Sequence, residues 1–116
     1  MVKLTDEELK ILERQFQVVS FPNACKLVYE HHIPHSAFAL LEGQMTIFKR
    51  SREVEKVPLG TMVGLFQLYY NQEAKAGCEI SSGSKVIIIT RSDIQDAVKL
   101  RTSPVYAIID KILNLT

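Results

Sequence analysis

The first residues of the chain follow the helical period of apolar positions. Leu9, Leu12 and Phe16 lie three and four residues apart, which predicts one apolar face of an amphipathic helix. A T-x-x-E pattern that starts at Thr5 stands in front of this face and is typical of a capping box. We therefore expect residues 1–16 to form an N-terminal helix that lies on the body of the domain.

The same period returns at the C-terminal end. Ser92 and Gln95 are spaced as a second capping box. Ser103 followed by Pro104 predicts another helix start, because proline fits the first helical position. Residues 92–116 are therefore expected to form two helices. The last helix should carry its aliphatic side chains on one face, at Val105, Ile108, Ile109, Ile112 and Leu113.

Between these helices the pattern changes to short runs of β-favouring residues separated by turn residues. Short strands without helices between them predict an antiparallel sandwich or barrel over residues 17–91. Gly43 separates two of the runs and predicts a hairpin between them. The alternating run 53–57 suits an edge strand, whereas the β-branched run 85–90 suits a buried central strand. The expected strands are 18–21, 26–29, 37–41, 44–48, 53–57, 78–80 and 85–90.

The stretch Leu59–Ile80 interrupts this pattern. Gly60 and Gly64 lie four residues apart, and the apolar residues after them predict a short helix that leads into a polar loop. Glycine permits a positive φ and lets a ligand approach the backbone closely. Backbone N–H groups at the start of a helix attract anions. The stretch therefore has the build of a phosphate cradle inserted between two strands.

Composition narrows the class of protein. With 116 residues, of which 47% are hydrophobic and 23% charged, the chain is expected to be a single soluble globular domain. A net charge of +1 gives no field that would attract nucleic acid or an anionic membrane. No apolar run is long enough to span a bilayer, and the first ten residues lack a hydrophobic signal core, so we expect a cytoplasmic protein. Cys25 and Cys78 are expected to be buried, reduced thiols.

Three segments resemble the cyclic-nucleotide-binding domain family. FPNACKLVYEHHIPHSAFALLEGQMTIFK is similar to the family's first strands, LGTMVGLFQLYY to its G-x-x-F-G-E-L-x-L run, and VIIITRSDIQDAV to its last strand and the helix after it. The resemblance covers nearly the whole chain. It implies an antiparallel β jelly roll (17–91) with one N-terminal helix (1–16) and two C-terminal helices (92–116).

The residues that bind the ligand in that family are only partly present at the matching positions of this chain. The family's phosphate-binding cassette has a Glu that accepts a hydrogen bond from the ribose 2′-hydroxyl and an Arg that pairs with the cyclic phosphate. Gly64 keeps its place, but the Glu position falls on Leu65 and the Arg position on Ala74. Each lost charged hydrogen bond costs about 2–5 kcal/mol. Lys75 and Ala76 complete the candidate ligand-binding set, in which Lys75 could supply the missing cation.

Two other clusters of polar residues were considered. His31, His32 and His35 precede a glycine turn as in the metal-binding cupins, but their spacing is HHxxH and Ser36 stands where a Glu ligand would be. No metal site is therefore expected, and exposed loop histidines are favoured. A basic run between Lys49 and Lys56 predicts a solvated turn, with a docking site for an acidic partner as the alternative.

Three functions follow, in order of preference. The first is a non-enzymatic regulatory module with no catalytic residues and no cofactor, which contacts a partner protein or forms a homodimer through the C-terminal helix. The second is a sensor of a cyclic nucleotide, cAMP or cGMP, or of another small anion, which signals through the same helix. The third is a cupin-like metal-dependent enzyme. No role with nucleic acid or membranes is expected.

Overall fold

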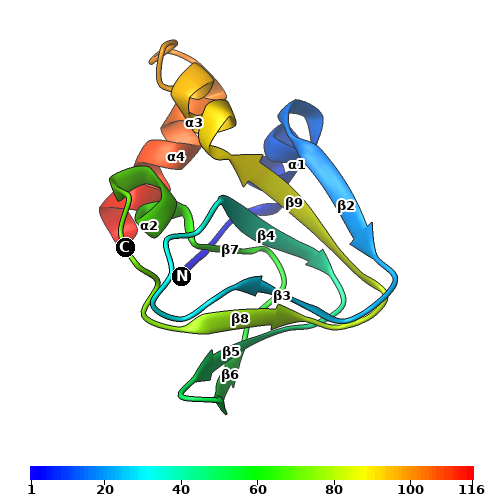
Figure 1. The fold of residues 1–116 in the computed structure, drawn as a ribbon. Helices are drawn as coiled ribbons and strands as arrows, with labels where there is room; N and C mark the ends of the chain where they lie inside the picture. The colour runs from blue at the N-terminus through cyan, green and yellow to red at the C-terminus, as the bar shows by residue number, and fades with distance from the viewer.

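Two antiparallel β-sheets form the body of the protein (Figure 1). The computed structural model describes residues 1–116. One sheet has the order β1 (Val2–Lys3), β7 (Thr61–Val63), β4 (Ser36–Glu42), β9 (Ser84–Thr90) and β2 (Gln17–Phe21). The other has the order β3 (Cys25–Val28), β8 (Gly77–Ile80), β5 (Met45–Lys49) and β6 (Arg52–Lys56). The expected antiparallel β-roll with flanking helices is confirmed.

Four helices accompany the sheets: α1 (Asp6–Gln15), α2 (Leu65–Tyr70), α3 (Arg91–Ala97) and α4 (Pro104–Leu115). Thr5 caps α1 as predicted, because its Oγ1 accepts from the Glu8 N–H at 3.1 Å and its own N–H donates to the Glu8 carboxylate at 2.8 Å. Ser103 caps α4 by accepting from the Tyr106 N–H. None of the four combines the length and apolar character that crossing a membrane requires.

The two strands with the clearest sequence patterns lie where they were expected. β9 pairs with β2 on one side and β4 on the other, so it is interior. Its side chains alternate between two parts of the core: Ile87 and Ile89 pack toward the helices, and Val86 packs toward the other sheet. β6 is an edge strand, and all five of its residues are exposed.

The hairpin predicted around Gly43 is wrong. β4 pairs with β7 and β9, whereas β5 pairs with β6 and β8 in the other sheet. Gly43 is therefore the corner at which the chain passes from one sheet to the other. Its φ is +89°, and a Cβ at this position would lie 2.6 Å from the Cβ of Ser84. Only glycine fits such a corner without moving β9.

Two further expectations need correction. The capping box of α3 is formed by Thr90 and Asp93 rather than by Ser92 and Gln95, so the helix begins directly where β9 ends. The helix expected over residues 1–16 begins only at Asp6, because Val2–Lys3 form strand β1, which pairs with β7 through Val2 and Met62. Strands of two and three residues are too short to show an alternating pattern in sequence.

The core consists of two clusters on either side of the five-stranded sheet. The larger cluster lies between this sheet and the helices, and Leu12 of α1 and Ile109 of α4 are almost fully buried in it. The smaller one lies between the two sheets. Figure 1 shows the helices on the side of the five-stranded sheet that faces away from the four-stranded one. This arrangement leaves α2 and the end of α4 beside the opening between the sheets.

Candidate functional site

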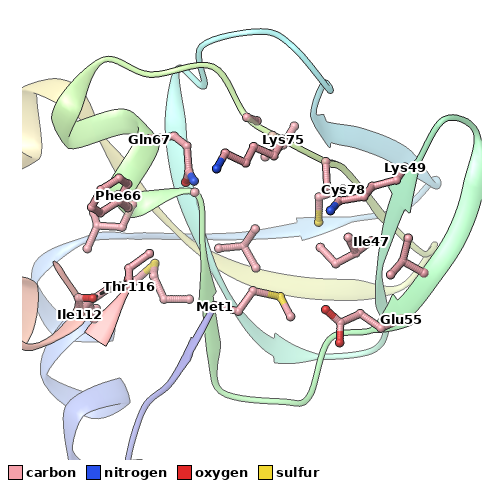
Figure 2. A pocket seen from close by; sticks show the side chains of 18 residues that line it. Met1, Ile47, Lys49, Glu55, Phe66, Gln67, Lys75, Cys78, Ile112 and Thr116 are labelled. Atoms are coloured by element: carbon pink, nitrogen blue, oxygen red, sulfur yellow. Dashed lines mark hydrogen bonds between the residues drawn. The ribbon is translucent and has the colours of Figure 1, made fainter. Parts of the chain in front are cut away.

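A cavity of about 280 Å³ lies where α2, the loop after it, the β5–β6 hairpin and the last turn of α4 meet (Figure 2). It contains the predicted ligand-binding set Gly64, Leu65, Ala74, Lys75 and Ala76, all of which line it. The structure therefore brings these five residues together around one space, although they come from both ends of the stretch between β7 and β8.

The start of α2 is set by Gly64 and Leu65. Gly64 has a φ of +87°, which favours glycine, and its carbonyl accepts the first helical hydrogen bond from the Leu68 N–H at 3.0 Å. Leu65 is 1% exposed and belongs to the core cluster under the helices. At the other end of α2, the Arg91 guanidinium donates to the Leu68 carbonyl. The helix is thus held by a buried anchor and by a hydrogen bond from α3.

The loop after α2 is fixed by its backbone. The Ala74 N–H donates to the His32 carbonyl at 2.8 Å, and the Ala74 carbonyl accepts from the His31 N–H at 2.7 Å. Ala74 is 6% exposed and its side chain is part of the cavity wall. No arginine lines the cavity. The position that the resemblance assigns to the phosphate-binding Arg therefore presents only a methyl group.

Three charged side chains line the cavity, Lys49, Glu55 and Lys75, together with the neutral amide of Gln67. Figure 2 shows Lys75 extending into the space from the loop, whereas Lys49 and Glu55 both extend into it from β5 and β6, the paired strands of one hairpin. Neither lysine forms an ion pair. The cavity thus holds two free cations against one carboxylate.

Sequence reasoning missed Lys49 and Glu55 as site residues. Lys49 was expected in a solvated basic turn, but it lies two residues after the cavity residue Ile47 on the same face of β5. That spacing is a usable indication once the strand is known to border a cavity. The rest of the basic run remains outside the cavity, and Lys56 pairs with Glu53 at 3.3 Å.

Cys78 forms part of the cavity floor. It is 1% exposed, and burial, helped by the nearby Glu79 charge, raises the pKa of its thiol to about 12. The thiol therefore stays neutral and behaves as a small apolar group. Cys25 is exposed on β3, so the expectation of two buried thiols is confirmed for Cys78 and wrong for Cys25.

The three histidines lie on the surface. His31, His32 and His35 are all exposed, as expected for loop histidines, and His31 lies 3.7 Å from the Glu30 carboxylate. No group of three or more His, Cys, Asp or Glu side chains is placed to hold a metal ion.

The candidate interaction helix α4 packs on its own domain. Val105, Ile108, Ile109 and Ile112 are buried in the larger core cluster, and Leu113 is half-buried at its border. Any contact of this stripe with another chain would require α4 to leave its place. The last turn of α4 also reaches the cavity, through Ile112 and Thr116.

One ion pair joins α4 to α1. The Lys111 ammonium lies 2.8 Å and 3.0 Å from the two carboxylate oxygens of Glu8, which is also the N3 residue of the capping box of α1. Partial burial alone would raise the pKa of Glu8, but the hydrogen bonds from Lys111 and Thr5 outweigh it and hold the pKa below its usual value. The pair adds one charged contact to the apolar packing that holds α4 against α1.

No protein-family model matches the chain, and neither does any curated protein. Solved structures do match. One belongs to a cyclic-GMP-dependent signalling pathway that regulates bacterial phytopathogenesis; it is 19% identical, with a TM-score of 0.80 over 99% of this chain and 94% of that one. Another is the catabolite activator protein of Thermus thermophilus, 18% identical with a TM-score of 0.72, of which this chain covers 54%.

A third match is a cyclic nucleotide-binding domain from Methylobacillus flagellatus, which is 18% identical with a TM-score of 0.66 over 85% of this chain and 58% of that chain. At such identities the likeness establishes the fold alone. The chain has the fold of cyclic-nucleotide-binding domains, in agreement with the resemblance drawn from its three sequence segments.

Proposed function

We propose that this protein is a non-enzymatic regulatory module that keeps the fold of a cyclic-nucleotide-binding domain but no longer recognises cAMP or cGMP. The observation that supports this is Ala74. It stands at the position where the resemblance expects an Arg, and it is buried in the cavity wall with both backbone groups already hydrogen-bonded.

The second cassette position supports the same proposal. Leu65 stands where the resemblance expects a Glu, and its buried side chain contributes only apolar surface to the cavity lining. A ribose hydroxyl in the cavity would meet no carboxylate there. The free lysines are poor substitutes for a guanidinium, because an ammonium is a point charge and lacks the paired N–H groups that match a phosphate. Loss of both the Glu and the Arg should weaken the binding of a cyclic nucleotide by several orders of magnitude.

Calorimetric titration of the folded chain with cAMP and with cGMP tests the proposal. We expect no heat of binding up to about 1 mM of either nucleotide, which corresponds to less than about 4 kcal/mol of binding free energy. A cooperative urea transition of the same sample shows that the chain is folded. Saturable binding of either nucleotide at micromolar concentration would overturn the loss of recognition.

The variant Ala74→Arg tests whether an Arg at position 74 improves the binding of a cyclic nucleotide. Ala74 borders the cavity, so an Arg side chain at this place can extend into it. We expect the variant to bind cAMP or cGMP at least about tenfold more tightly than the original chain, the gain of one charge-assisted contact. Gln72→Arg is the matched control, because Gln72 is exposed and outside the cavity. Equal affinities of the two variants would show that position 74 does not face the ligand.

We further propose that the module acts by contact with a protein, in the cytoplasm, with α4 as the element that changes. α4 supports this role because Ile112 borders the cavity while the adjacent Lys111 pairs with Glu8 of α1. A change at the cavity can therefore affect the contact between α4 and α1. The partner is either a different protein or a second copy of this chain.

A further inference from the structure

We propose that the cavity is a binding site for a small amphipathic anion, a molecule with an apolar body and one carboxylate or sulfonate head. This inference goes beyond the proposed function, which concerns only the loss of cyclic nucleotides. It identifies the chemical class of ligand that fits the apolar lining and the charged side chains of the cavity.

The walls fit an apolar body. Twelve of the eighteen residues that line the cavity are hydrophobic, and Val28, Ile47, Leu65 and Cys78 among them are buried. Small-molecule sites in proteins are mostly apolar with a few placed polar groups. A volume of about 280 Å³ is at the small end of such sites. The site therefore suits a compact ligand whose burial is driven by the hydrophobic effect.

The charges fit a single anionic head. Lys49 and Lys75 both extend into the cavity, and neither has a carboxylate partner. Glu55 lies on β6, the strand paired with the strand of Lys49 (Figure 2), so an anion is favoured near the two ammonium groups and disfavoured near the Glu55 carboxylate. With no arginine in the lining, nothing offers the paired donors that a phosphate prefers. A singly charged carboxylate or sulfonate needs only the point charges that are present.

The Gln67 amide adds a neutral polar group on the α2 side of the cavity. Ile112 and Thr116, at the C-terminal end of α4, line the cavity beside α2. A ligand that fills the cavity would touch both α2 and α4. Binding should therefore stabilise α4 in its packed position as well as the chain as a whole.

The experiment uses octanoate, 1-octanol and octylammonium, three probes with the same apolar chain and a negative, neutral or positive head. Octanoate and octylammonium are kept below their micelle concentrations and 1-octanol below its solubility limit. Binding to the whole chain is followed by amide chemical shifts in NMR titrations. We expect octanoate to bind at least about fivefold more tightly than 1-octanol, because the two exposed lysines contribute a modest attraction each. Octylammonium should bind most weakly, and salt should weaken octanoate alone.

Variants assign the charge effect to residues. Lys49→Met and Lys75→Met keep most of the apolar stem and remove the cation. Each variant should lower the affinity for octanoate about two- to fivefold and leave the affinity for 1-octanol unchanged. The double variant should abolish the preference for octanoate over 1-octanol. Lys10→Met is the matched control, because Lys10 is exposed on α1 and far from the lining. Glu55→Gln should tighten octanoate slightly.

Three results would overturn the inference: equal affinity for octanoate and 1-octanol, a preference for octanoate that survives the double variant, or shifts confined to residues outside the cavity. Absence of binding by all three probes would also overturn it. These outcomes are distinct from a failure of the proposed function, which would appear as micromolar binding of cAMP or cGMP whatever octanoate does.

Discussion

At the scale of single residues, Gly43 sets the path of the chain between the two sheets. Its φ is +89°, and an added Cβ would lie 2.7 Å from the Cα of Ser84, a backbone atom of β9 that cannot move alone. We expect Gly43→Ala to lower the free energy of unfolding by about 3 kcal/mol. This sum combines a left-handed backbone penalty of about 1–2 kcal/mol with the cost of overpacking. Urea denaturation measures it.

Gly83→Ala separates these two contributions. Gly83 also has a positive φ, +78°, but nothing lies within 4 Å of its added Cβ. In this variant the free energy of unfolding should fall only by the penalty for the left-handed backbone, about 1 kcal/mol. If the two alanine variants were equally stable, the close contact with Ser84 would have no energetic consequence.

The two cysteines should differ sharply in reactivity. The thiolate is the reactive form, and burial raises the pKa of the Cys78 thiol to about 12. Cys25 is exposed on β3. At pH 8 we expect one thiol per folded chain to react rapidly with a disulfide reagent and both to react in urea. Cys25→Ser should remove the rapid reaction, and rapid labelling of Cys78 in the folded Cys25→Ser variant would contradict its burial.

At the scale of elements, the helices could be predicted from sequence far better than the pairing of strands. The caps at Thr5 and Ser103 are confirmed, since a cap involves residues only three apart in the chain, whereas the box expected at Ser92 is displaced by two residues to Thr90. The error at Gly43 has the opposite origin, since the partners of β4 and β5 lie far away in sequence. A glycine between two strand-like runs looks the same whether it turns the chain back or carries it to a second sheet.

The contact of α4 with α1 should make stability depend on pH. The pKa of Glu8 is lower in the folded chain than in the unfolded one, so the pair stabilises the fold above about pH 5 and this contribution disappears as the pH falls through the folded pKa. Lys111→Met should lower the free energy of unfolding by up to about 1 kcal/mol at pH 7, since the pair is partly exposed. The difference from the original chain should vanish near pH 3.

Lys99→Met is the control for this prediction. Lys99 lies 3.7 Å from Asp96 within one turn, and both side chains are 77% exposed. An ion pair of that kind contributes little, so the variant should match the original chain at both pH values. A Lys111→Met variant that is equally stable at pH 7, or whose deficit persists at pH 3, would show that the Glu8 pair does not hold α4.

At the scale of the whole molecule, the candidate site is assembled from segments that are distant in sequence. The resemblance located Gly64, Leu65, Ala74, Lys75 and Ala76, because these residues lie in one stretch, and all line the cavity. Lys49, Glu55 and Ile112 could not be placed there from sequence, since the folding of β5, β6 and α4 around the same space decides their role. The charge of the cavity, two lysines against one glutamate, follows only from the tertiary structure.

Self-association also depends on how α4 is packed in the whole molecule. The apolar stripe of α4 is buried in its own domain, so a dimer formed through this stripe requires α4 to leave that domain first. We therefore expect the chain to have a mass of 13.2 kDa at micromolar concentration. Lys111→Met, which removes the contact that ties α4 to α1, should raise the dimer fraction in light scattering, and Lys99→Met should not.

Hydrogen exchange of α4 then distinguishes the mechanism of association. If α4 must open before two chains associate, the open form has to exist in the monomer. Amide hydrogen exchange in α4 of the monomer should then be faster under conditions that favour the dimer. A stable dimer of the original chain in which α4 stays as protected as in the monomer would mean that another face carries the contact. The buried stripe would then serve the fold alone, and the exposed surface of the roll would be the place to seek the partner.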